Sequence, residues 1–197
     1  MTVKIMPLGD SITSGYGYEG GYRLRLGSLI REATYDATFV GSLENGPTDM
    51  LSRRHEGHDG WTIPQLAVPL NGWLRAHQPN IVLLHMGTND LWEEFSVLET
   101  LANLEGLIRQ ICGQLPHALL MAAAIIRANL STEAYDARVR DYGDAIPDLV
   151  YNLAGEGLPV LLVDMRNLGV ETEDGVHPTA AGYDLMGAQW WAVMQGG

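Results

Sequence analysis

The segment VKIMPLGDSIT, residues 3–13, decides how this chain is expected to fold. Its first part, residues 3–8, is a mainly apolar run of strand length, and the turn-forming residues Gly9, Asp10 and Ser11 follow it directly. Four more apolar runs of similar length occur at residues 37–40, 81–86, 118–123 and 160–163. Segments with a helical pattern lie between and after these runs, at residues 22–33, 63–77, 97–115, 132–153 and 179–194.

This alternation of strands and helices predicts an α/β fold. Short strands that each lead into a helix form a parallel sheet with helices on both faces. The near-continuous apolar character of the runs agrees, because such a sheet is buried on both sides. A chain of 197 residues with no internal repeat, low-complexity tract or linker fits one domain over residues 1–197.

The composition argues against several kinds of partner. Acidic residues outnumber basic ones 24 to 12, so the net charge is −12. That charge repels phosphate backbones and anionic lipid, which argues against nucleic acid and membrane surfaces. No apolar run is long enough to span a bilayer, and the N-terminus lacks the features of a secretory signal. The single cysteine, Cys112, excludes an internal disulfide framework, and its apolar neighbours predict a small buried side chain.

Reactive residue types gather where a parallel sheet binds its ligands, which is beyond the carboxyl ends of the strands. Residues 55–61 are expected to lie there in a long loop after the second strand. The four polar segments that follow expected strands are Gly9-Asp10-Ser11, residues 55–61, Gly87-Thr88-Asn89-Asp90 and Asp174-Gly175-Val176-His177.

Ser11, His177 and Asp174 have the chemistry of a catalytic triad. A serine hydroxyl is a weak nucleophile that needs an adjacent base and a group that orients this base. His177 can be the base, and Asp174 lies three residues earlier, close enough for a turn to bring its carboxylate to the imidazole. The backbone N–H of Gly60 and the side-chain amide of Asn89 are candidate donors to the oxyanion that forms when the serine attacks a carbonyl.

The four segments together resemble the SGNH (GDSL-type) hydrolases, which are named for Ser, Gly, Asn and His in four blocks. The order and spacing of the blocks match along almost the whole chain. The blocks are here Gly9-Asp10-Ser11-Ile12-Thr13, Gly57-His58-Asp59-Gly60-Trp61-Thr62, Gly87-Thr88-Asn89-Asp90 and Asp174-Gly175-Val176-His177. Gly57 and Gly60 both lie in the second block, and the Gly-x-Thr spacing favours Gly60.

The resemblance implies a flavodoxin-like three-layer α/β/α sandwich with a five-stranded parallel sheet. It implies the triad of Ser11, His177 and Asp174. It also implies an oxyanion hole made by the backbone N–H groups of Ser11 and Gly60 and the side chain of Asn89. No cofactor is required for such a site.

Within this group, three stretches resemble the third family of carbohydrate esterases, which are mostly acetyl xylan esterases and related deacetylases. These stretches are Met6-Pro7-Leu8-Gly9-Asp10-Ser11, Phe39-Val40-Gly41-Ser42 and residues 55–65. The resemblance implies a serine esterase that removes acetyl or another short acyl group from acetylated carbohydrate such as xylan. It also implies an extracellular monomer, while a cytoplasmic location stays open. Ser14 departs from this pattern, since many relatives have an acidic residue there.

Two other functions stay open. The first is a general short-chain esterase, lysophospholipase or thioesterase with the same triad, which would differ in the length of its pocket. The second is a non-catalytic carbohydrate-binding domain that has kept the fold. Such a domain is expected to have lost a block residue, and none is lost here.

His55, His58 and Asp59 suggest a metal site, but their spacing argues against one. The two histidines are separated by Gly57 and do not form the helical His-Glu-x-x-His pattern of zinc hydrolases. We therefore expect no catalytic metal.

Two tryptophans and one carboxylate lie in or near the blocks. Trp61 and Trp92 adjoin block residues, and they either line the substrate pocket or stiffen the loops by packing. Asp90 follows the block residue Asn89, and we expect it to support its loop and take no part in catalysis.

Overall fold

The centre of the structure is a parallel sheet of five strands that pair in the order β2-β1-β5-β6-β7. The computed structural model describes residues 2–127, 129–130 and 132–196. All five strands coincide with the expected apolar runs to within one residue at either end, and they confirm the α/β fold. Their bounds are β1 Val3–Gly9, β2 Ala37–Phe39, β5 Ile81–His85, β6 Leu119–Ala124 and β7 Val160–Asp164.

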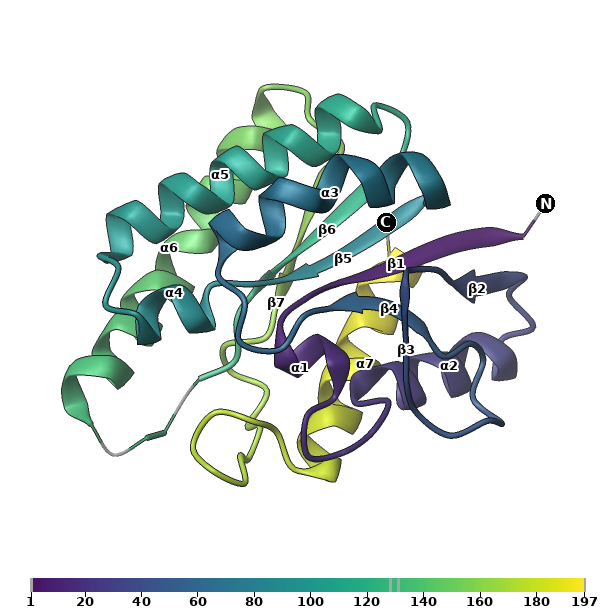
Figure 1. Cartoon of the computed structure of the whole chain (residues 1–197), viewed down its shortest axis with the longest axis horizontal. Helices are drawn as coiled ribbons and strands as arrows, with labels where there is room; N and C mark the ends of the chain where they lie inside the picture. Colours follow the sequence, from purple (N-terminus) through teal and green to yellow (C-terminus); the bar gives the residue numbers. More distant parts are fainter. Residues whose placement is uncertain (1, 128, 131, 197) are drawn as a thin grey trace.

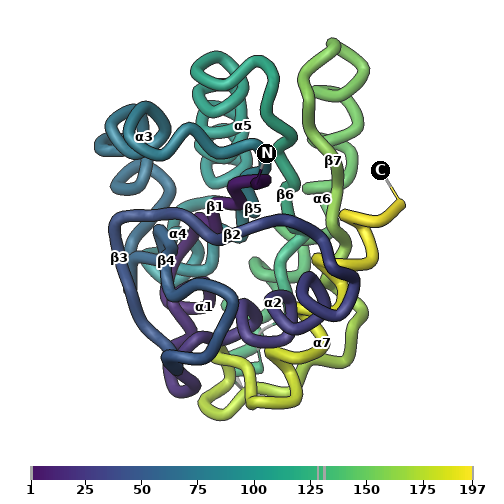
Figure 2. Tube along the Cα trace, turned by 90° about the vertical axis from the view of Figure 1, so that its right-hand side faces the viewer, coloured from purple at the N-terminus to yellow at the C-terminus, as the bar shows by residue number. Residues whose placement is uncertain are grey.

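Five long helices cover the two faces of this sheet (Figures 1 and 2). Helices α3, α5 and α6 pack on one face, and α2 and α7 pack together on the other. All five lie within two residues of the segments that the helical pattern predicts. Their bounds are α2 Tyr22–Glu32, α3 Ile63–His77, α5 Val97–Gln114, α6 Glu133–Gly155 and α7 Ala180–Gly196.

The strands explain why the apolar runs are nearly continuous. Along β5, the side chains of Val82 and Leu84 join the core under α3, α5 and α6, while Leu83 between them joins the core under α2 and α7. A sheet that is buried on both faces needs apolar residues at every position and not at alternate ones. Trp190 of α7 is completely buried in the second of these cores.

Two additional strands form a ribbon that the sequence did not predict. β4 (Arg54–Gly57) runs parallel to β1 and pairs with its last residues, with Gly57 opposite Gly9. β3 (Leu43–Glu44) is antiparallel to β4. The expectation of a long loop over residues 55–61 is therefore wrong for its first three residues. The strand was not predicted because β4 is short and polar and so gives no apolar signal. It forms because β1 offers it backbone groups that are free to pair.

Two short helices follow β1 and β5 at the edge where the candidate residues gather. α1 (Ser11–Ser14) begins directly after β1, and α4 (Thr88–Trp92) begins three residues after β5. In Figure 1, α1 lies between the β3–β4 ribbon and α4. Neither helix was expected, because helices of four or five residues are too short to show a periodic pattern.

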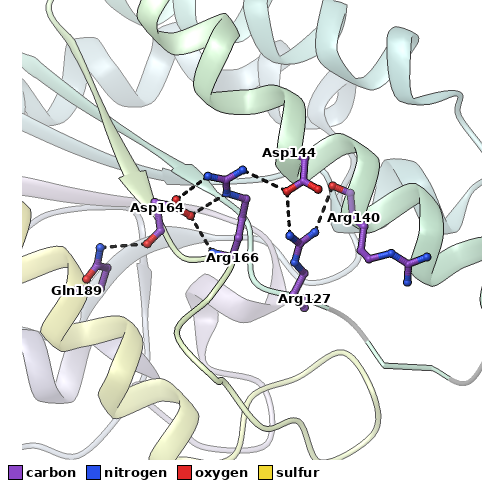
Figure 3. Close-up of polar contacts among 6 residues, drawn as sticks. All are labelled: Arg127, Arg140, Asp144, Asp164, Arg166 and Gln189. Carbon is purple, nitrogen blue, oxygen red and sulfur yellow. Dashed lines mark hydrogen bonds and ion pairs between the residues drawn. The ribbon is translucent and has the colours of Figure 1, made fainter.

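A cluster of charged side chains fixes the loops that leave β6 and β7 (Figure 3). Arg127, which follows β6, and Arg166, which follows β7, both donate to Asp144 of α6, at 2.8 and 3.1 Å. The guanidinium group of Arg166 also donates two hydrogen bonds to the Asp164 carboxylate, at 2.9 and 2.6 Å. The backbone carbonyl of Asp164 accepts from the side chain of Gln189 in α7. Such bidentate contacts are more specific than isolated surface pairs, so this cluster ties both loops to the helices beside them.

Within the described part of the chain, no helix is both long and apolar enough to cross a bilayer.

Gly57 is predicted to be essential for packing α1 on β4. A Cβ at this position would overlap the backbone nitrogen of Ser14, which cannot move without shifting α1. Gly57→Ala should therefore lower the free energy of unfolding by about 1–3 kcal/mol, as overpacking does elsewhere. Urea unfolding monitored by circular dichroism measures this change.

Gly106→Ala is the matched control, because a Cβ on this exposed glycine of α5 meets no other atom. It should leave stability unchanged or raise it by up to about 1 kcal/mol. A Gly57→Ala protein as stable as the control would contradict the packing described for α1.

Candidate active site

Ser11 is held at the sharp turn between β1 and α1. The turn is tight because Gly9 has no side chain, since a Cβ there would overlap Thr13 and the carbonyl oxygen of His85. Asp10 caps α1, with its Oδ1 accepting from the Ile12 N–H at 2.9 Å. Ser11 is thereby placed as the first residue of the helix, and only 7% of it is exposed.

The structure brings Ser11, His177 and Asp174 into one chain of hydrogen bonds. Ser11 Oγ lies 2.9 Å from His177 Nε2, and His177 Nδ1 lies 2.7 Å from Asp174 Oδ2. The other oxygen of Asp174 accepts from the backbone N–H groups of Val176 and His177, at 3.0 and 2.8 Å. A base that contacts the hydroxyl on one side and a carboxylate on the other can take the serine proton and be stabilised as a cation.

The carboxylate of Asp174 is kept ionised by its surroundings. Partial burial raises its pKa, but the hydrogen bonds from the backbone and ring of His177 and from the Val176 N–H outweigh this effect. Together they lower the pKa of Asp174 to about 2. A permanently ionised partner favours the Nδ1–H tautomer of His177, which leaves Nε2 free to accept the proton of Ser11.

The loop that carries His177 is fixed from three sides. Gly175 has a φ of 90°, which favours glycine, and its carbonyl accepts from the Asn129 N–H at 2.8 Å. The His177 carbonyl accepts from the Glu173 N–H at 2.8 Å. The Tyr16 ring packs against the imidazole with a centroid distance of 4.4 Å. The sequence analysis missed Tyr16, and its only signal is that it lies five residues after Ser11.

The three expected oxyanion donors lie on neighbouring segments. Asn89 is the second residue of α4, and its Nδ2 donates to the Trp61 carbonyl at 2.9 Å, so the third block is tied to the second. The second hydrogen on Nδ2 stays available. Within the described residues, the backbone N–H groups of Ser11 and Gly60 donate to no other group. Their role in stabilising negative charge stays a prediction.

Gly57 and Gly60, the two glycines of the second block, lie in different surroundings. Gly57 belongs to β4 and packs against α1. Gly60 follows in the loop, has a φ of 76°, and has open space where a Cβ would be. The His58 N–H donates to the Gly9 carbonyl at 2.9 Å, and this bond holds the loop beside the start of α1.

A pocket of 280 Å³ lies beside His177 and Asn89. The side chain of Trp92 lines it and meets Tyr135 edge to face at 5.6 Å. The Trp61 side chain lies elsewhere and stacks on His58 at 4.3 Å. The residues that line the pocket are Thr88, Asn89, Trp92, Leu130, Tyr135, Asp174, Val176 and His177.

Each of the two histidines that suggested a metal uses one ring nitrogen in a contact within the protein. His55 Nδ1 accepts from the Gly57 N–H at 3.0 Å. The His58 ring lies between those of Trp61 and Trp73, and its Nε2 contacts Glu56 at 3.0 Å. Among the residues that the structure describes, no three histidine, cysteine or acidic side chains are grouped as metal ligands.

Two carboxyl groups close to Ser11 and Asn89 in sequence are completely buried. Burial is the main cause that raises the pKa of Asp10 to about 7, and the nearby Asp90 adds to it. Burial likewise raises the pKa of Asp90 to about 6, although the Ile63 N–H, at 3.0 Å, donates to this carboxyl group. Asp90 thus connects the loop after β5 to the start of α3, as expected for a supporting residue.

Arg23 is a buried cation that the sequence analysis missed. Its guanidinium group donates to the carbonyl oxygens of Thr13 and Ser14, at 3.3 and 3.0 Å, and to the Arg53 carbonyl at 3.1 Å. Burial lowers the pKa of Arg23 to about 10. Because Thr13 and Ser14 end α1, Arg23 satisfies the carbonyl end of the nucleophile helix and joins it to the chain before β4.

Comparisons with known proteins agree with this geometry. A model of the GDSL-like lipase/acylhydrolase family matches residues 8–185. The chain is similar to a solved family 3 carbohydrate esterase of Clostridium thermocellum, at 34% identity and a TM-score of 0.86, over 98% of this chain and 94% of that one. It is similar to a solved acetyl esterase mutant with an acetate ion, at 25% identity and a TM-score of 0.84, over 98% and 97% of the two chains.

A multidomain esterase of Ruminococcus flavefaciens is 27% identical over 99% of this chain. The chain spans 29% of the length of that relative.

The buried carboxyl group of Asp10 is predicted to make stability depend on pH. Its pKa is raised from 3.8 to about 7, so the folded state binds the proton more tightly than the unfolded state. Its contribution to stability is therefore complete below pH 4 and is lost as the pH rises through 7. As the pH rises from 4 to 8, the free energy of unfolding of wild type should fall by roughly 4 kcal/mol relative to that of Asp10→Asn, because one pKa unit is worth about 1.4 kcal/mol.

Urea unfolding at a series of pH values measures this difference. Asp49→Asn is the control, because it makes the same substitution at an exposed position. Parallel curves for wild type and Asp10→Asn would rule out the buried, protonated carboxyl group.

Proposed function

Because the chain belongs to the GDSL-like lipase/acylhydrolase family, we propose that it is a serine esterase that releases acetyl groups from an acetylated carbohydrate. The chain is a carboxylic ester hydrolase, and within this family it resembles the family 3 carbohydrate esterases. The polysaccharide that we propose as its substrate is acetylated xylan. The observation that carries the proposal is the unbroken contact chain from Ser11 through His177 to Asp174.

The proposed reaction is a two-step acyl transfer. In the first step, Ser11 Oγ attacks the ester carbonyl while His177 Nε2 takes its proton and Asp174 stabilises the imidazolium. His177 then gives this proton to the oxygen of the departing sugar, and the acyl group remains on Ser11. In the second step, His177 activates a water molecule that releases the acid and restores the serine.

The negative charge that forms on the carbonyl oxygen needs donors that are already in place. The backbone N–H groups of Ser11 and Gly60 and the free N–H of Asn89 are suited to this role, because none has to give up another contact among the described residues. Fixed donors stabilise the transition state without the cost of reorganising solvent. The bond from Asn89 to the Trp61 carbonyl supports this arrangement by fixing the amide plane.

The acetyl specificity rests on the relatives, whose names describe a family 3 carbohydrate esterase and an acetyl esterase. We propose that the acyl group enters the pocket beside His177, where Trp92 and Tyr135 form one wall. The net charge of −12 is compatible with a neutral ester of a sugar.

A general short-chain esterase is the second candidate, and one observation favours it. The pocket of 280 Å³ is larger than an acetyl group requires, and Leu130, Val176, Trp92 and Tyr135 give it an apolar lining. Such a lining would also accept a longer acyl chain.

The triad is predicted to act as a unit. Ser11→Ala and His177→Ala should each lower kcat for p-nitrophenyl acetate by at least roughly a thousandfold, and the double variant should be little worse than either. Asp174→Asn should retain more activity, because Ser11 and His177 are still in contact. Steady-state kinetics measure these effects. If the losses in kcat of the two single variants add up in the double variant, the assignment of Ser11 and His177 to one triad is wrong.

Acyl length is predicted to separate the two candidates. Wild type should release acetate from acetylated xylan, while Ser11→Ala should not. Among p-nitrophenyl esters, kcat/KM should be highest for acetyl, lower for butyryl and lowest for octanoyl, since chains that do not fit keep the carbonyl from Ser11. Trp92→Ala should shift this order toward longer chains, because Trp92 lines the pocket.

Tyr151→Ala serves as the control, since it removes an equally exposed aromatic side chain of α6 that does not line the pocket. A wild-type preference for octanoyl would establish the general esterase instead.

A further inference from the structure

A second pocket, of 310 Å³, lies on the other side of the nucleophile. The sheet order β3-β4-β1-β5-β6-β7 puts the β3–β4 ribbon on one side of β1 and the pocket beside His177 on the other. Ser11 follows β1 as the first residue of α1, and in Figure 1 this helix lies between the β3–β4 ribbon and α4. The second pocket is lined by Ser14, Leu43, Glu44, Asn45, His55, Gly57, His58, Asp59 and Trp61.

The lining of this pocket includes a buried donor with no acceptor. His55 is only 2% exposed, and its Nδ1 accepts from the Gly57 N–H, so a neutral ring has its hydrogen on Nε2. Burial lowers the pKa of His55 to about 3, which keeps the ring neutral. Among the described residues, Nε2 has no hydrogen-bond partner. A buried N–H without an acceptor is unfavourable, and an oxygen of a ligand would satisfy it.

Acceptors and an aromatic ring complete the lining. Asp59 accepts from the Ser14 hydroxyl through Oδ1, at 2.5 Å, and its second oxygen stays available. Glu44 is half-exposed at the rim of the pocket. The guanidinium groups of Arg53 and Arg54 lie 3.7 and 3.5 Å from its carboxylate oxygens. The Trp61 ring is held rigidly, because it stacks on His58, which stacks in turn on Trp73.

This combination matches the chemistry of a neutral sugar. A sugar hydroxyl can accept from the neutral His55 donor and donate to the carboxylates of Asp59 or Glu44. The ring of a sugar presents C–H groups to an aromatic side chain such as Trp61. An anionic ligand would instead meet two carboxylates, and the two arginines at the rim already contact Glu44.

We propose that this pocket is a subsite for an unesterified, neutral sugar unit of the polysaccharide whose acetylated unit reacts at Ser11. The proposal rests on the proposed function, and it adds the location of the neighbouring sugar. Asp59 and Trp61 flank Gly60, so a sugar in this pocket lies directly beside the proposed oxyanion loop. Binding there would hold the chain while the ester is positioned at the nucleophile.

Binding of unesterified oligosaccharides tests the subsite without any hydrolysis. The full chain with Ser11→Ala is titrated by calorimetry with xylotetraose and, separately, with tetragalacturonate. Xylotetraose should bind saturably, and the anionic oligosaccharide should bind at least about tenfold more weakly. In NMR spectra, the chemical shift of the Trp61 indole N–H should change during the xylotetraose titration.

Two variants locate the binding. His55→Asn keeps an oxygen for the Gly57 N–H and removes the donor at the Nε2 position, and it should raise Kd about fivefold, as the loss of one hydrogen bond does. Leu43→Trp fills the pocket from an exposed edge strand and should abolish binding even if His55→Asn does not fold. Val68→Trp is the matched control, because it adds the same ring at an exposed position of α3 outside the pocket.

The results separate the subsite from the esterase activity. Xylotetraose binding that Leu43→Trp abolishes and Val68→Trp preserves would support the subsite, even if wild type released no acetate from acetylated xylan. Absence of saturable binding, equal affinity for the anionic oligosaccharide, or unchanged affinity in Leu43→Trp would overturn it. Any of these outcomes would leave the proposed hydrolysis to be judged by acetate release alone.

Discussion

Close packing of backbone around Gly9 is the constraint on which the active site depends. At this residue, β1 pairs with β5 on one edge and with β4 on the other. A side chain on Gly9 would overlap Thr13 and the carbonyl of His85, and one on Gly57 would push α1 away. Because both positions are glycine, three backbone segments meet at the end of β1. Ser11, the loop that contains Gly60 and the block that contains Asn89 are neighbours for this reason.

Several polar groups are buried under this junction, and they stabilise its geometry at a cost to the fold. Asp10 caps α1 from a completely buried position, and one of its oxygens has no partner among the described residues. Arg23 supplies positive charge at the other end of the same short helix. A helix of four residues has little stability of its own, so these contacts from both ends are what keep Ser11 in place. Functional sites commonly carry such locally unfavourable groups.

Pockets lie on both sides of Ser11, and the two differ in character. The pocket beside His177 has an apolar wall, whereas the pocket beside β3 and β4 offers a neutral donor and carboxylates. Ser14 contributes to the second side, because its hydroxyl contacts Asp59 and so links α1 to the loop that contains Gly60. An acidic residue at this position would face Asp59 with like charge.

The sequence by itself determined the five parallel strands, the five long helices and the order of the four blocks. Apolar periodicity and turn residues are local signals, and the position of reactive residues after strands follows from the α/β fold. The tertiary structure alone decided that residues 54–57 form a strand, that Arg23 is buried, and that Tyr16 packs on His177. It also created the second pocket, which exists only because β4 pairs with the end of β1. Such features depend on contacts between segments far apart in the chain, and a short polar stretch carries no local trace of the partner that orders it.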